Sequence, residues 1–142
     1  MKKIVKKEVE KLIKELELNC SIEEFKDKLD NKFDNYMTGW GCISVEKKLS
    51  LSFIREFKDK INWFHVSLVS NLSETFIKEF KNKVNWYWIT RHQKLSEQFI
   101  YEFQDKLDID YLIENDKITK NRLLELREVN IINSRFDILD IR

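Results

Sequence analysis

The chain has 142 residues, of which 42% are hydrophobic and 36% are charged, with two glycines and no proline. This composition excludes a disordered chain, and the length suits one domain with a sizeable core. The formal net charge of +1 excludes a protein whose whole surface holds nucleic acid by charge. Because glycine and proline are scarce, little interrupts helices, and tight hairpins lack their usual residues. We therefore expect a single all-α domain.

The first expected element is an amphipathic helix within residues 1–17. Its main apolar residues recur at spacings of four, three and four, which is typical of one helix face. A stack of repeats needs an end cap with a polar outer face, so we expect this helix to cap such a stack. The apolar residues are Val5, Val9, Leu12 and Leu16.

Three segments in the middle of the chain share one pattern at a fixed spacing. The pattern Leu-Ser-x-x-Phe-Ile-x-Glu-Phe begins at Leu49, Leu72 and Leu95, so the period is 23 residues. A constant period of this kind indicates a solenoid of stacked helical repeats, in which each repeat buries its apolar face against its neighbours. The regular repeats are residues 49–71, 72–94 and 95–117.

Each regular repeat is expected to form a helix, a turn and a shorter helix. From Phe53 to Ile61 the apolar residues stand at i, i+1, i+4 and i+8, which is one helix face and lacks the alternation of a strand. A serine precedes each first helix, and an asparagine or aspartate precedes each second helix, where such side chains act as N-caps. These residues are Ser50, Ser73 and Ser96 for the first helices, and Asn62, Asn85 and Asp108 for the second helices.

The two ends of the array are irregular. Residues 18–48 match the first regular repeat at offsets of 32 and then 23 residues, so an insertion of nine residues is expected to lengthen its first helix by about two and a half turns. A capping box formed by Ser21 and Glu24 marks the start of that helix. Residues 118–142 are a degenerate repeat in which Arg122 replaces a phenylalanine, which suits a terminal cap. For the last ten residues, a short helix and an extended tail both stay open.

This repeat pattern, over residues 20–132, resembles short repeats of uncharacterised proteins from large DNA viruses, phages and mobile elements, which have a similar lysine-, asparagine- and isoleucine-rich composition. The resemblance implies an origin in a mobile genetic element and implies no fixed activity. Free thiols are the default for the two cysteines, Cys20 and Cys42, so we expect a reducing compartment, the host cytoplasm. No apolar run approaches the length needed to span a membrane.

The sequence offers little support for catalysis or for a bound metal or cofactor. Cys20, Cys42, His65 and His92 match no metal-ligand spacing, and no third group is singled out to assist a cysteine and a histidine in catalysis. Glutamates such as Glu56 recur with the period, which is typical of a scaffold rather than of one catalytic constellation. We expect no cofactor, no metal site and no enzymatic activity.

The candidates for partner binding are residues that vary where the scaffold repeats. Large side chains fill the two positions inside the second-helix pattern, and both cannot face the same core, so some should be exposed. Three of them, His65, Trp88 and Tyr111, are expected to stack as a ladder, although the same rings also suit the seam between repeats. Trp, Tyr and Arg are the residues most enriched in binding hot spots. The candidates are His65, Tyr87, Trp88, Arg91, His92 and Tyr111.

These features favour a non-enzymatic protein-binding module that inhibits or adapts a host protein, for example an anti-CRISPR inhibitor of a bacterial defence effector, acting as a monomer or homodimer. The alternative is a nucleic-acid-binding accessory protein, in which the basic N-terminal helix holds phosphates and exposed rings stack on bases. The low net charge argues against this alternative. Its lysines are Lys2, Lys3, Lys6 and Lys7.

Overall fold

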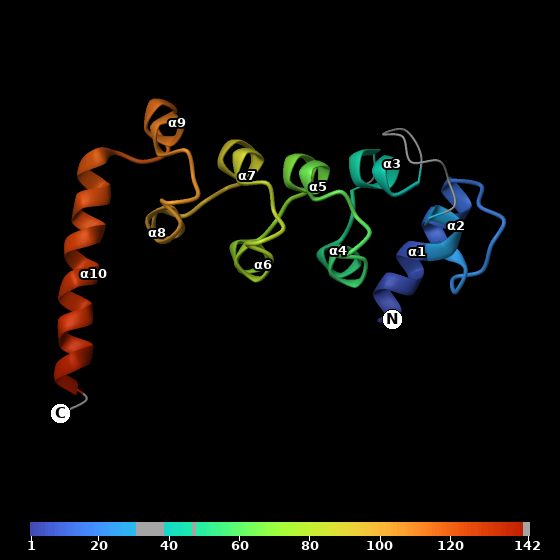
Figure 1. The fold of residues 1–142 in the computed structure, drawn as a ribbon, viewed down its shortest axis with the longest axis horizontal. Helices are drawn as coiled ribbons and strands as arrows, with labels where there is room; N and C mark the ends of the chain where they lie inside the picture. Colours follow the sequence, from blue (N-terminus) through green and yellow to red (C-terminus); the bar gives the residue numbers. More distant parts are fainter. Residues whose placement is uncertain (31–38, 47, 141–142) are drawn as a thin grey trace. The chain divides into compact units, whose positions relative to one another are not determined.

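The computed structural model describes residues 1–30, 39–46 and 48–140 (Figure 1). These residues form ten α-helices and no β-strand, which confirms the all-α fold class. Backbone contacts divide the chain into two compact units, Met1–Asn85 and Trp86–Arg142. The boundary falls inside the second regular repeat, and the organisation as a single domain stays a prediction.

Each regular repeat contributes one pair of short helices, as the period predicts. The pairs are α4 with α5, α6 with α7, and α8 with α9. Among the described residues, the first compact unit contains α1 (Lys3–Glu15), α2 (Phe25–Asp30), α3 (Gly39–Glu46), α4 (Leu51–Glu56), α5 (Trp63–Val69) and α6 (Glu74–Glu79). The second compact unit contains α7 (Trp86–His92), α8 (Glu97–Glu102), α9 (Ile109–Glu114) and α10 (Lys120–Asp140).

Helix α1 is the expected amphipathic helix, and it packs against α4. Its apolar side chains Val5, Val9 and Leu12 are buried. On the same helix, the Glu8 carboxylate accepts hydrogen bonds from the backbone N–H and from the hydroxyl of Ser50, the N-cap of α4. Polar contacts as well as apolar burial therefore tie α1 to the start of α4.

The predicted N-caps are present at the short helices. The three serines, together with Asn62 and Asp108, accept a hydrogen bond from the backbone N–H three residues further on, at 3.1 to 3.2 Å. Ser21 and Glu24 bond to each other's backbone N–H, which confirms the capping box. Because helices of six or seven residues are too short to be stable alone, caps and packing must fix where they begin.

The first helix of each regular repeat is shorter than the apolar spacing predicts. Helix α4 ends at Glu56 rather than near Ile61, because Phe57 leaves the helical conformation at φ −106° and ψ 27°. A separate turn follows, in which the Ile61 N–H donates to the Phe57 carbonyl at 3.1 Å, and both side chains stay buried. The spacing of four thus survives the break. The prediction of a shorter second helix was wrong, since α5 has seven residues and α4 has six.

The irregular C-terminal repeat is one helix, α10, of 21 residues, which packs against α8 (Figure 1). Residues 133–140 continue this helix, so the short separate helix and the extended tail are both ruled out there. Ile131 stands where asparagine or aspartate precedes the second helices of the regular repeats. Isoleucine cannot cap a new helix, so the first one continues. The lengthened helix expected in residues 18–48 falls on residues 31–38, outside the described residues.

A buried hydroxyl links the second helices of successive repeats, and the sequence analysis missed it. The Ser67 hydroxyl donates to the Trp63 carbonyl at 2.7 Å and accepts from the Asn85 N–H at 2.9 Å. The same two bonds recur at Ser44 and Thr90, 23 residues before and after. All three hydroxyl side chains are buried. This hydroxyl bridge satisfies the buried oxygen and the N–H of the next cap residue together.

The tryptophan of a second helix packs on two phenylalanine rings from the next repeat. The Trp63 ring lies 6.3 Å from Phe76 and 5.0 Å from Phe80, measured between centroids. Aromatic pairs at these separations add to the apolar area that they bury. The second compact unit repeats the arrangement, with Trp86 at 6.4 Å from Phe99 and 5.3 Å from Phe103.

Replacing the bridging hydroxyl at Ser67→Ala should destabilise the protein by about 1–3 kcal/mol, because the Asn85 N–H loses a buried acceptor. The free energy of unfolding from urea denaturation measures the effect. Ser134→Ala is the matched control, since the Ser134 hydroxyl also donates to the carbonyl four residues back but is exposed. The control should stay within about 0.5 kcal/mol of the native chain. Equal losses in the two variants would contradict the structural role of the bridge.

Candidate partner-binding surface

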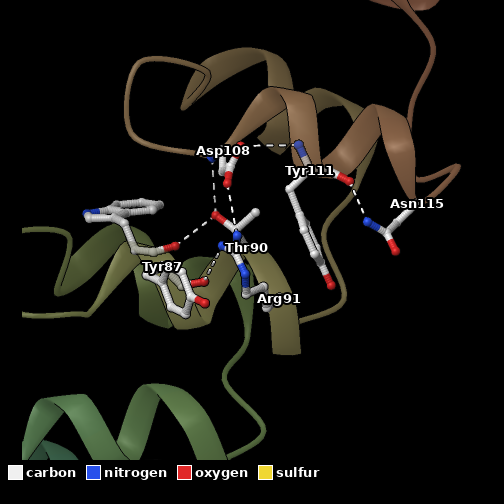
Figure 2. Close-up of polar contacts among 7 residues, drawn as sticks. Tyr87, Thr90, Arg91, Asp108, Tyr111 and Asn115 are labelled. Carbon is white, nitrogen blue, oxygen red and sulfur yellow. Dashed lines mark hydrogen bonds and ion pairs between the residues drawn. The ribbon is translucent and has the colours of Figure 1, made fainter.

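Three of the residues singled out from the sequence converge on the guanidinium of Arg91. Its Cζ lies 3.7 Å from the centroid of the Tyr87 ring and 4.3 Å from that of the Tyr111 ring. Figure 2 shows Arg91 between the two tyrosines. A guanidinium over an aromatic face is attracted by the ring quadrupole, so these contacts hold both rings and the arginine in place.

The carboxylate of Asp108 completes what we call the Arg91 cluster: Tyr87, Arg91, Asp108 and Tyr111. Arg91 Nη2 donates to Asp108 Oδ2 at 3.0 Å, and the Tyr111 backbone N–H donates to Oδ1 at 3.1 Å (Figure 2). The second bond, followed by the first, lowers the pKa of the Asp108 carboxyl below its ordinary value. Asp108 is therefore ionised at neutral pH, and it offsets the charge of Arg91.

Helices α7 and α9 position the cluster. Tyr87 and Arg91 stand four residues apart on α7 and so share a face, with Arg91 Nη1 donating to the Tyr87 carbonyl at 3.4 Å. Asp108 is the N-cap of α9, and its own N–H donates to the Thr90 hydroxyl at 3.4 Å. The hydroxyl bridge thus sets the distance between the two helices that carry the cluster.

The cluster is partly open to solvent. Tyr87 is 55% exposed, whereas the Arg91 side chain is 19% exposed. Next to Tyr87 on α7, the Trp88 ring meets the Tyr87 ring edge-on at 4.8 Å and the His92 ring at 5.2 Å. Five of the six predicted partner-binding residues therefore lie on one pair of helices, four on α7 and Tyr111 on α9.

The sixth predicted residue, His65, lies on α5 in the other compact unit, where it meets the Phe64 ring edge-on at 5.3 Å. A ladder that runs from His65 through Trp88 to Tyr111 stays a prediction. Within the second compact unit, Tyr111 makes its contact with Arg91. Sequence reasoning missed Asp108 as part of the site, and the available signal was a charged residue at a cap position that asparagine fills in the two preceding repeats.

The Arg91 cluster does not repeat along the array. The positions 23 residues before and after Arg91 hold Leu68 and Glu114, and those around Tyr87 hold Phe64 and Asp110. The cluster therefore belongs to one pair of repeats, as expected for a specific site on a periodic scaffold.

An open hollow of about 450 Å³ lies beside Arg91. Its lining combines apolar side chains, including Ile100 and Leu112, with the basic or titratable side chains of His92, Lys94 and Lys117. This lining suits a group that has an apolar stem and an acidic or polar tip.

The lysines of the nucleic-acid alternative lie at the start of the chain. Lys2 precedes α1, Lys3, Lys6 and Lys7 lie on it, and all four side chains are exposed. They form a local basic surface next to glutamates of the same helix.

No group of three or more His, Cys, Asp or Glu side chains that could hold a metal ion is found in the part of the chain that the structure describes. In the same residues no helix is long and apolar enough to cross a membrane. Comparisons with protein-family models, curated proteins and solved structures find no match to this chain. The geometry of its own residues therefore carries the functional argument.

The pKa of Asp108 should be lower than that of an ordinary aspartate, and NMR titration of its carboxyl carbon measures it. A lowered pKa in the folded state means that ionised Asp108 stabilises the fold above its unfolded pKa, and that this contribution is lost as the pH falls through the folded pKa. Arg91→Met should raise the pKa only part of the way, because the Tyr111 N–H still donates to the carboxylate. An ordinary pKa for Asp108 in the native chain would contradict the cluster geometry.

Proposed function

We propose that this chain is a non-enzymatic protein-binding module, and that the Arg91 cluster with Trp88 and His92 forms its partner-binding surface. The observation that carries the proposal is the fixed position of Arg91 between Tyr87 and Tyr111 on helices that a periodic scaffold holds. Tyrosine, tryptophan and arginine supply much of the binding energy at protein interfaces.

Order before binding favours affinity at such a surface. Tyr87 is exposed, yet Arg91 holds its ring, and Asp108 in turn holds Arg91. Side chains that are already fixed lose less conformational entropy when a partner binds. The exposed ring can therefore serve as an anchor for the partner.

The charge balance of the cluster favours a protein over nucleic acid. Asp108 offsets Arg91, so the cluster presents ring faces rather than a net positive charge to phosphates. The neighbouring hollow, with its basic rim and apolar lining, suits an acidic or polar side chain of a protein partner. The absence of catalysis is also proposed, because the ionisable groups of the cluster are engaged with each other.

The scaffold is proposed to be a small α-solenoid. Support comes from the hydroxyl bridge and from the tryptophan packing, both of which recur with the 23-residue period inside each compact unit. Contacts that repeat from one repeat to the next are the basis of solenoid stability.

The resemblance of the repeat to those of viral, phage and mobile-element proteins gives the partner a concrete form. We propose that it is a host protein in the cytoplasm that the module inhibits or adapts, and an effector of a bacterial CRISPR defence system is one such target. Nucleic-acid binding through Lys2, Lys3, Lys6 and Lys7 is the competing function, since those side chains are exposed together.

Affinity capture from nuclease-treated host extract, at low and high salt, tests the proposal. The native chain should retain a specific protein at both salt concentrations. With that protein purified, calorimetry should show that Tyr87→Ala and Tyr111→Ala each weaken binding by about tenfold or more. Gln98→Ala is the control, because Gln98 is exposed on α8 of the same compact unit, and its affinity should match the native value.

Two outcomes would contradict the proposal. One is a captured protein that binds the tyrosine variants as tightly as the native chain, with circular dichroism showing all variants folded. The other is recovery of nucleic acid alone from untreated extract, lost at high salt and lost in the variant Lys3→Glu, Lys7→Glu.

A further inference from the structure

Helix α10 carries large apolar side chains that the rest of its compact unit leaves uncovered. Its first turns pack against α8 and bury Leu126. Beyond that point every described side chain from residue 131 to residue 137 is exposed. The large apolar residues there include Val129 at 51%, Ile132 at 51% and Phe136 at 60% exposure. Exposed apolar groups that gather on one element mark an interaction surface.

Those three residues form one stripe with a heptad spacing. Val129, Ile132 and Phe136 stand at i, i+3 and i+7, the spacing of the seam along which two helices pair. Glu128 precedes the first of them and Arg135 precedes the last. These two residues therefore take the same flanking position beside the seam, with opposite charges.

We propose that α10 pairs with the α10 of a second copy of this chain in an antiparallel homodimer, which buries the stripe of Val129, Ile132 and Phe136. In an antiparallel pair, residues at that flanking position face each other, so Glu128 of each copy meets Arg135 of the other. Two-fold symmetry makes this ion pair occur twice. A parallel pair would place Glu128 against the neutral Asn133 and lose both ion pairs.

The length of the uncovered segment supports a helical partner. The segment from Arg127 to Asp140 is 14 residues long, and isolated helices of roughly that length are marginal in water. Pairing removes its apolar stripe from water and so stabilises the helix. The net charge of +1 gives two copies little reason to repel each other.

The stripe is short, so the dimer is expected to be weak and to dissociate on dilution. The inference is independent of the proposed function, because the Arg91 cluster lies on α7 and α9. A dimer would present two copies of that cluster.

Sedimentation equilibrium of the full chain over a wide range of concentrations tests the proposal. The mass should rise from 17.4 kDa towards twice that value as concentration increases. Ile132→Asp should hold the chain at 17.4 kDa throughout. Leu124→Ser is the matched control, because Leu124 is 57% exposed on the same helix but lies off the stripe, and this variant should dimerise like the native chain.

Charge swaps test the orientation. Glu128→Arg and Arg135→Glu should each raise the dissociation constant by about fivefold or more, because like charges then face each other twice. The double swap should restore the native constant. A native chain that stays monomeric at every concentration would overturn the proposal, and so would a dimer that Ile132→Asp leaves intact. Failure of the double swap to restore pairing would overturn the antiparallel arrangement.

Discussion

The hydroxyl bridge is the constraint on which the rest of each repeat depends. A hydroxyl that donates within its own helix and accepts from the next cap residue has two partners at fixed distances, so the second helices cannot slide past each other without losing a buried hydrogen bond. Because the bridge takes the backbone N–H of the cap residue, the side chain of that residue stays available to cap its own helix. At Asp108 one oxygen caps α9 and the other holds Arg91.

The candidate site is a small set of substitutions on this repeated frame. Arginine replaces leucine at position 91, and aspartate replaces asparagine at position 108, relative to the preceding repeat. Together these changes place a guanidinium between two tyrosine rings and balance its charge. The periodic residues fix where the helices lie, and the residues that differ define the surface that a partner can recognise. This division is what a binding function on a repeat scaffold requires.

Local features of the fold could be predicted from the sequence, and features that depend on neighbouring repeats could not. The serine caps and the capping box at Ser21 were predictable, because their signals lie within a few residues. The break at Phe57 was not, because a new turn preserves the spacing of four across it. The uninterrupted α10 follows from the missing cap at Ile131. Tyr87, Arg91 and Tyr111 were identified as candidates, but their partner Asp108 was interpreted only as a cap.

Amide hydrogen exchange, followed by NMR, tests the central claim most directly. The backbone N–H groups of Asn62, Asn85 and Asp108 lie outside the helical hydrogen bonds of their own repeats, and each donates to a buried hydroxyl 18 residues earlier. If these bridges hold the repeats together, the three amides should exchange as slowly as amides in the middle of the neighbouring helices. Exchange as fast as that of exposed connecting residues such as Asn71 would contradict this account of the fold.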